Sequence, residues 1–287
     1  MTDAASILAP VDWERMAEPQ ADGYDTEVIL ELAAAAGLRC RSCAPRGFPR
    51  FGDGAVEIAP APARGLMSDA IAPAARDHPN LIAAAGYLRR WPAAHAQFQA
   101  LIDTVYPYSD PAQAAQGDWS LGSSSHSHGG QWGRVYVTVD DALGLAQALI
   151  HETAHQKLDA LGVHMNKADR LIVNDAAESY LHPHFTGRRQ PMTAVFHEQY
   201  TFIHVAALNL HMLAEAENER ERQRILMLLA RNTIRMEAGH DEIAGNIRTD
   251  RDGALFVDAF LQWSRNVLAR GRAELDANGY GFAPIQT

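Results

Sequence analysis

The chain has 287 residues, of which 47% are hydrophobic and 21% are charged, a balance typical of one large folded domain or two small ones. The formal net charge of −10 argues against nucleic acid as the main partner, because phosphate binding needs clustered Lys and Arg. No apolar stretch is long enough to span a bilayer, and the first residues lack a signal-peptide pattern, so we expect a cytoplasmic protein without membrane contact. Cys40 and Cys43 form a lone C-x-x-C, which without a second half predicts two inert thiols.

The first half of the chain predicts helices separated by irregular segments. A helix is expected over residues 24–38, and a Pro-, Ala- and Gly-rich connector over 45–75. Residues 80–105 have helical periodicity that is interrupted near Pro92. Residues 106–131 change character and predict a loop with at most one short edge strand.

The second half begins with the best strand of the chain, R-V-Y-V-T-V at 134–139. Asp140 and Asp141 follow and favour the start of a helix that runs to about Leu161. Residues 162–191 are mostly irregular, and three long helices are expected at 192–217, 219–247 and 252–275. We therefore predict a single domain over residues 1–287 that is mainly α with a small β element. It combines an N-terminal helical region at 1–105 with a metal-binding core at 106–275.

The predicted helix after the strand contains H-E-T-A-H, the H-E-x-x-H pattern of zinc peptidases. Residues four apart lie on one helix face, so His151 and His155 can bind the same metal ion. Glu152 lies beside them and is the general base of the hydrolytic reaction in zincins. The short strand directly before this helix matches the zincin arrangement, so the sequence predicts a zincin-like metal helix.

A third protein ligand is needed, and the sequence offers several candidates. Asp175 and Glu178 lie downstream, with Asp175 near the position where gluzincins keep a ligand glutamate. His182 and His184 follow in L-H-P-H-F. His197 lies on a strongly predicted helix, which holds a ligand more precisely than a loop does. His204, seven residues later, is expected to be a packed core residue.

A longer pattern resembles one family. S-S-S-H precedes the strand R-V-Y-V-T-V-D-D, then come A-L-I-H-E-T-A-H-Q-K-L-D-A-L and E-S-Y-L-H-P-H-F-T-G-R-R-Q-P-M-T-A-V-F-H-E-Q-Y. Over residues 119–210 the chain resembles the H-E-x-x-H-containing peptide-modification proteins of ribosomal peptide natural product pathways. Pro191 and His197 fit the family's Pro-to-His interval, and Gln190 stands where an Arg directly before the Pro is expected.

The resemblance implies an Fe(II)- and 2-oxoglutarate-dependent oxygenase that hydroxylates a β-carbon of a precursor peptide. It implies iron held by His151, His155 and His197, with Arg188 or Arg189 pairing with the distal carboxylate of oxoglutarate. Glu152 would then orient a metal ligand or a substrate amide. The S-S-S-H-S-H segment at 123–128 would pair with an extended peptide, or it is simply a loop before the strand.

The alternative is a zinc metallopeptidase. It would use His151, His155 and either Asp175 or Glu178 as zinc ligands, with Glu152 as the base. Tyr180, Tyr200 or His204 would then stabilise the oxyanion. A non-catalytic peptide-binding module with a structural metal is a third hypothesis, which open coordination positions disfavour.

Overall fold

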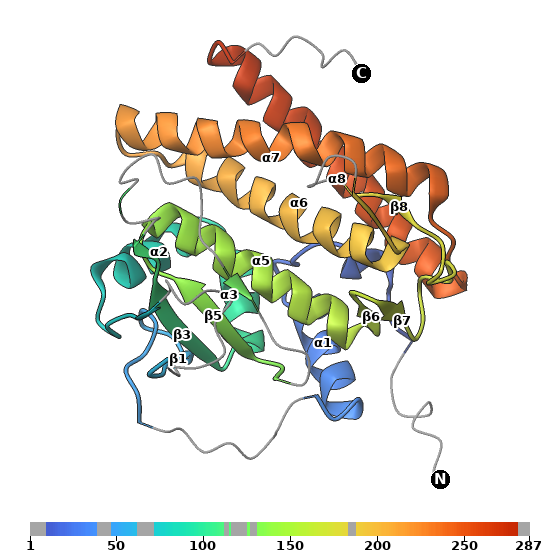
Figure 1. The fold of residues 1–287 in the computed structure, drawn as a ribbon, viewed down its shortest axis with the longest axis horizontal. Helices are drawn as coiled ribbons and strands as arrows, with labels where there is room; N and C mark the ends of the chain where they lie inside the picture. Colours follow the sequence, from blue (N-terminus) through green and yellow to red (C-terminus); the bar gives the residue numbers. More distant parts are fainter. Residues whose placement is uncertain are drawn as a thin grey trace.

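The fold is taken from a computed structural model. It describes residues 10–38, 47–61, 72–111, 115, 125–126, 131–182 and 188–280. These residues form a mainly helical structure with one five-stranded sheet and two short hairpins, which confirms the predicted class. In Figure 1, α5 (Ala142–Ala160) lies between the sheet and α6 (Met192–Ala214), and α6 lies between α5 and α7 (Glu219–Asn246). Within the described ranges, no helix is both long and apolar enough to cross a membrane.

The N-terminal region supplies three helices and a short 3-10 turn at Glu14–Met16. The predicted first helix is α1 (Tyr24–Ala35). The predicted stretch at 80–105 divides near Pro92, as expected, into α2 (Pro79–Arg89) and α3 (Pro92–Leu101), since proline fits the first turn of a helix but not its interior. All three pack against α5. Cys40, Cys43 and residues 45–46 and 62–71 of the predicted connector lie outside the described residues.

The prediction of a loop from residue 106 was wrong at its start, because β3 (Thr104–Ser109) is a central strand of the sheet. Pro107 in its middle argued against a strand. In the structure, however, the hydrogen bonds of Val105 and Pro107 point to one side, where Ala59 N donates to Val105 O and Ala74 N donates to Pro107 O. Strand β1 ends at Ile58, and β2 pairs with the next residues of β3. Pro107, which has no N–H to donate, therefore lies where β3 changes from one partner strand to the other.

The sheet has the order β1-β3-β5-β4, and β2 pairs with β3 from the same side as β1. Its strands are β1 (Glu57–Ile58), β2 (Ala72–Pro73), β3, β4 (Ser125–His126) and β5 (Arg134–Thr138). Strands β1, β3 and β5 are parallel, while β2 and β4 are antiparallel to their neighbours. The sheet is larger than the sequence predicted, and the boundary expected at residue 105 falls inside β3. Of the S-S-S-H-S-H segment, only residues 125–126 are described.

The predicted strand and helix around the metal motif are confirmed as β5 and α5. Asp141 caps α5, with its Oδ2 accepting from Gly144 N at 2.9 Å, and its Oδ1 accepts from Arg224 Nη2 of α7 at 2.8 Å. The first turn of the metal helix is therefore fixed both to its own backbone and to a neighbouring helix.

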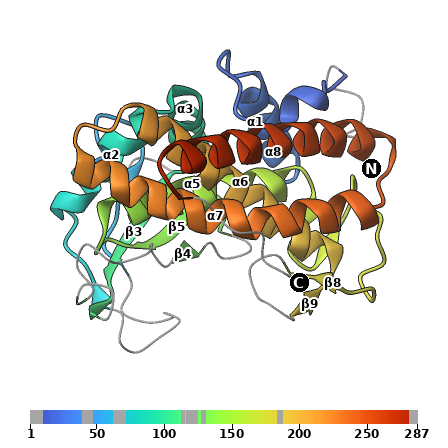
Figure 2. The ribbon, with the colours of Figure 1, turned by 90° about the horizontal axis from the view of Figure 1, so that it is seen from above.

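Two hairpins connect α5 to α6, in a region that the sequence left mostly irregular. They are β6 (Val163–His164) with β7 (Lys167–Ala168), and β8 (Tyr180–Leu181) with β9 (Arg189–Gln190). The β8–β9 hairpin lies against α6 and α7 (Figure 2). The three predicted C-terminal helices are α6, α7 and α8 (Arg251–Ala277), and α8 packs on both α6 and α7.

Candidate metal centre and its surroundings

The metal-motif helix α5 is buried almost all round, as expected for a helix covered by the sheet on one side and by α6 on another. Its partly exposed residues are Ala142, His151, His155 and Asp159. The last three follow one another at intervals of four, so they form a single line along the helix. The two histidines of the motif thus lie on the accessible stripe of this helix.

The two imidazoles face each other at a distance that suits a shared metal ion. His151 Nε2 and His155 Nε2 are 3.0 Å apart, and the rings are nearly perpendicular at 79°. Two nitrogen ligands that each lie about 2.0–2.1 Å from one ion are themselves roughly 3 Å apart when they occupy adjacent positions. The pair is therefore spaced as two ligands of one ion would be.

His197, which the sequence predicted as the third ligand, contacts His155 on the other side of its ring. Its Nδ1 lies 2.8 Å from His155 Nδ1, on the side of that ring away from His151. Its Nε2 lies 2.8 Å from the carbonyl oxygen of Val163. His197 therefore packs behind His155 in this structure, and its role as a ligand stays a prediction.

This contact determines the tautomer of His155. A carbonyl only accepts hydrogen bonds, so His197 Nε2–H donates to Val163 and His197 Nδ1 carries a lone pair. His155 Nδ1–H then donates to His197, which leaves the lone pair of His155 Nε2 directed toward His151. Burial lowers the pKa of His197 to about 4 and the pKa of His155 well below its usual value, so both rings are neutral. A metal ligand oriented through its second nitrogen is common in metalloproteins.

The other predicted ligands lie elsewhere. Glu178 is exposed, pairs with Arg248 and accepts from the hydroxyl of Tyr180, contacts that hold the pKa of Glu178 below its usual value. Across the described ranges, no group of three His, Cys, Asp or Glu side chains converges on one point. His182 is buried in the β8–β9 region, and His184 lies outside the described residues.

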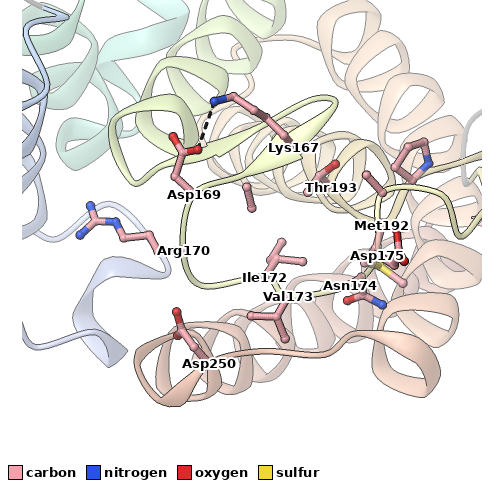
Figure 3. A pocket seen from close by; sticks show the side chains of 13 residues that line it. Lys167, Asp169, Arg170, Ile172, Val173, Asn174, Asp175, Met192, Thr193 and Asp250 are labelled. Atoms are coloured by element: carbon pink, nitrogen blue, oxygen red, sulfur yellow. Dashed lines mark hydrogen bonds and ion pairs between the residues drawn. The ribbon is translucent and has the colours of Figure 1, made fainter.

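Asp175 lines a cavity of about 340 Å³, which Figure 3 shows. The surrounding side chains come from β7, the segment after it, the start of α6 and the cap of α8, and both signs of charge are present, with Lys167 paired to Asp169. The Oδ1 of Asp175 accepts from Ala177 N at 2.9 Å in a local turn. Its gluzincin-like spacing therefore does not bring it to the histidine pair, because the chain turns away to pair residues 171–173 with residues 248–250.

The two predicted oxoglutarate-binding arginines have different surroundings. Arg189 donates through Nη2 to Ser179 O and through Nε to Ser179 Oγ, so it closes the hairpin. Arg188 acts electrostatically on both His182 and Glu198. With the Gln190 amide in the orientation that satisfies its hydrogen bonds, its Oε1 accepts from Arg188 Nε at 3.0 Å and from Nη2 at 3.1 Å. Of the two arginines, Arg188 is therefore the one that interacts with Glu198 on α6.

Three further residues that the sequence offered for catalysis are buried. Glu152 is 2% exposed, so it lies off the accessible stripe. Tyr200 is fully buried, and burial raises its pKa well above the usual value. His204 donates through Nδ1 to Tyr200 O at 2.8 Å, and burial lowers its pKa to about 3, which confirms that it is a core residue.

Glu198 is a partly buried acid on α6 that the sequence analysis did not single out. It follows His197 directly, is partly buried, and its pKa is raised to about 7 by burial, against the opposing effect of Arg188. The H-E-Q-Y letters gave no hint of its placement, because the face that α6 turns toward α5 depends on how the two helices pack.

A second missed feature lies on the far side of the metal helix. Lys157 and Asp25 form an ion pair at 2.9 Å, and both side chains are fully buried. Asp25 Oδ2 also accepts from Gln97 Nε2, and Oδ1 accepts from Gln20 N. This cluster ties α1 and α3 to α5 two residues after His155.

No protein-family model matches the chain, and no curated protein matches it either. The functional conclusions below therefore depend on the geometry of the site together with the sequence pattern.

Proposed function

We propose that this protein is a non-haem Fe(II)- and 2-oxoglutarate-dependent oxygenase that hydroxylates a side-chain carbon, at the β-position, of a ribosomally made precursor peptide. The observation that carries the proposal is the combination of two imidazoles spaced for one ion, His151 and His155, with Arg188 beside the β8–β9 hairpin. Hydrolysis needs no such cation, whereas binding a dicarboxylate co-substrate does. The zincin-like order of strand and metal helix is compatible with this reading.

The residues of the chain have separate tasks in this proposal. His151 and His155 would hold the iron, and His197 would keep His155 in its metal-binding tautomer. Arg188, steadied by Gln190, would pair with the distal carboxylate of oxoglutarate. Bound iron would supply the oxidation, in which one oxygen atom of O₂ enters the C–H bond and the other enters succinate as oxoglutarate loses CO₂. Glu152, buried beside the histidines, would support the ligand helix.

The purified protein, loaded with Fe(II) under anaerobic conditions, should be mixed with oxoglutarate and candidate precursor peptides and then exposed to air. Mass spectrometry should show the gain of one oxygen atom in a peptide, with one succinate formed per hydroxylation. His151→Ala should abolish both signals. A wild-type protein that consumes no oxoglutarate with any peptide, while binding Fe(II), would refute the oxygenase proposal.

A zinc peptidase is the second candidate, favoured by a carboxylate, Glu152, directly beside the paired histidines. The same peptides incubated with the zinc-loaded protein distinguish the two reactions, because hydrolysis gives two fragments whose masses sum to the peptide plus water. In that case Glu152→Gln should stop cleavage while zinc remains bound.

A further inference from the structure

The cavity that Asp175 lines has the size of a ligand pocket. Its volume of about 340 Å³ lies at the lower end of the range of about 300–1,000 Å³ that is usual for such pockets. The described residues that line it include no histidine, and they come from β7, the segment after it, residues 191–193 at the start of α6, and Asp250. The cavity is therefore distinct from the histidine pair and has room for a short peptide segment.

Most polar side chains around the cavity already bind the protein itself. Both carboxylate oxygens of Asp250 accept from backbone N–H groups. The amide of Asn174 both donates and accepts within the protein, and the Thr193 hydroxyl donates to Met165 O. Arg170 donates to a backbone carbonyl, and its guanidinium points away from the cavity in Figure 3. These side chains form the wall and are not free to bind a ligand.

Lys167 and Asp175 retain capacity for a ligand. Lys167 has three N–H donors, of which its pair with Asp169 uses one, and its side chain is 66% exposed. One carboxylate oxygen of Asp175 accepts from a backbone N–H, and in the described part of the chain the other has no hydrogen-bond partner. Figure 3 shows the two charges on different sides of the cavity, with Ile172 and Val173 along a third side. Val173 is 54% exposed, so the cavity offers an apolar surface as well as two opposite charges.

The β6–β7 hairpin connects this cavity to the proposed metal site. Ala168 lines the cavity and pairs with Val163 on the other strand of the hairpin. The carbonyl oxygen of Val163 lies 2.8 Å from Nε2 of His197, which in turn contacts His155. The cavity is thus linked to His155 through one strand pair and two side-chain contacts.

We propose that this cavity binds a short segment of the precursor peptide that carries an acidic and a basic side chain on either side of an apolar one. The acidic side chain would pair with Lys167, the basic one with Asp175, and the apolar one would lie on Ile172 and Val173. Protein charges on different sides of the cavity favour a segment of several residues over a free amino acid, which carries its two charges on one carbon. The inference rests on the proposed function and names a feature of its substrate.

Capped tripeptides test the inference without turnover. The full-length protein should be titrated with acetylated and amidated Lys-Leu-Glu, Glu-Leu-Lys, Lys-Leu-Lys and Glu-Leu-Glu, with binding followed by saturation-transfer NMR. At least one mixed-charge tripeptide should bind more tightly than both single-sign ones, because complementary charges favour a partner and like charges oppose it. Lys167→Glu and Asp175→Lys should each weaken that binding about two- to fivefold, as expected for exposed charge pairs. Lys167→Glu should shift the preference toward Lys-Leu-Lys, and Asp175→Lys toward Glu-Leu-Glu.

Two neighbouring alanines supply a blocking variant and its control. Ala176 lines the cavity, so Ala176→Trp should fill it and abolish tripeptide binding. Ala177 is exposed and does not line the cavity, so Ala177→Trp should bind the tripeptides as the wild type does. Mixed-charge tripeptides that bind no more tightly than single-sign ones, or that bind Ala176→Trp as tightly as the wild type, would overturn the inference.

Oxoglutarate turnover tests the proposed function separately. Wild-type turnover with a precursor peptide, without any tripeptide binding, would overturn the cavity assignment and leave the oxygenase proposal standing. Tripeptide binding that Ala176→Trp abolishes, without oxoglutarate turnover for any peptide, would support the binding site and refute the oxygenase proposal.

Discussion

The buried ion pair beneath the metal helix offers the sharpest test of how this fold positions its site. Asp25→Asn keeps the size of the side chain but removes its charge, which leaves Lys157 without its buried counterion. Both side chains are fully buried, and Asp25 accepts from Gln97 and Gln20 in addition to Lys157. Burial lowers the pKa of Lys157 and Asp25 raises it, so the loss of Asp25 removes the main group that stabilises this charge.

The expected cost follows from this burial. Removing one partner of a buried ion pair destabilises a protein by about 3–5 kcal/mol. The unfolding entropy is about 2.1 cal/mol/K per residue, or roughly 0.6 kcal/mol/K for a chain of this length, so the melting temperature should fall by about 5–8 °C. Calorimetry and urea unfolding of the metal-free protein measure both quantities.

Two controls make the result interpretable. Asp22→Asn removes the same charge from an exposed pair with Arg15 and should change stability far less than Asp25→Asn does, because solvent screens an exposed ion pair. The double variant Asp25→Leu with Lys157→Met replaces the pair by apolar groups and should recover most of the loss, because a buried pair is often no more stable than an apolar replacement. If Asp25→Asn costs under about 1 kcal/mol, the buried pair does not stabilise the fold as argued.

Two further predictions concern the co-substrate and the backbone. Arg188→Ala should raise the KM for oxoglutarate at least about tenfold, since a charged hydrogen-bonded pair contributes about 1.5–3 kcal/mol. Arg189→Ala should change this KM little, because Arg189 binds Ser179. Equal effects of the two variants in steady-state kinetics would contradict the assignment of Arg188. Gly253→Ala should lower the melting temperature, because the added Cβ would overlap the carbonyl of Leu171. Gly245→Ala, in open space on α7, should instead stabilise the protein by about 0.5–1 kcal/mol. An unchanged melting temperature for Gly253→Ala would show that the 171–173 segment moves freely.

The sequence predicted those elements whose cause is local. The α5 helix follows from its aspartate cap and its run of helix-forming residues, and the break at Pro92 follows from the chemistry of one residue. The strand β3 was missed because Pro107 reads as a strand breaker. The structure tolerates it only because β1 ends beside it, and that is a property of a partner strand some fifty residues away in the chain.

The same distinction divides the site. His151 and His155 could be paired from the sequence because four residues on one helix fix their separation. The role of His197 could not, because it depends on the rotation of α6 against α5. Neighbouring residues on α6 have different surroundings. His197 is buried behind His155, whereas Glu198, the next residue, is partly exposed. Spacing counted along the chain misled in the case of Asp175, since the intervening segment pairs with residues 248–250.

The metal motif leaves both oxidation and hydrolysis possible, and the directions of the two neighbouring arginines bear on the choice. Side chains that are adjacent along an extended segment point to opposite sides, so Arg188 and Arg189 face opposite sides of the hairpin. Arg189 faces Ser179, and Gln190, two positions from Arg188, lies on the same side as Arg188 and binds it. The glutamine in place of the expected arginine thus supports Arg188, which acts electrostatically on Glu198. The proposed oxygenase needs such a fixed guanidinium for its anionic co-substrate, whereas a peptidase does not, so the Arg188 variant bears directly on the choice between the two proposals.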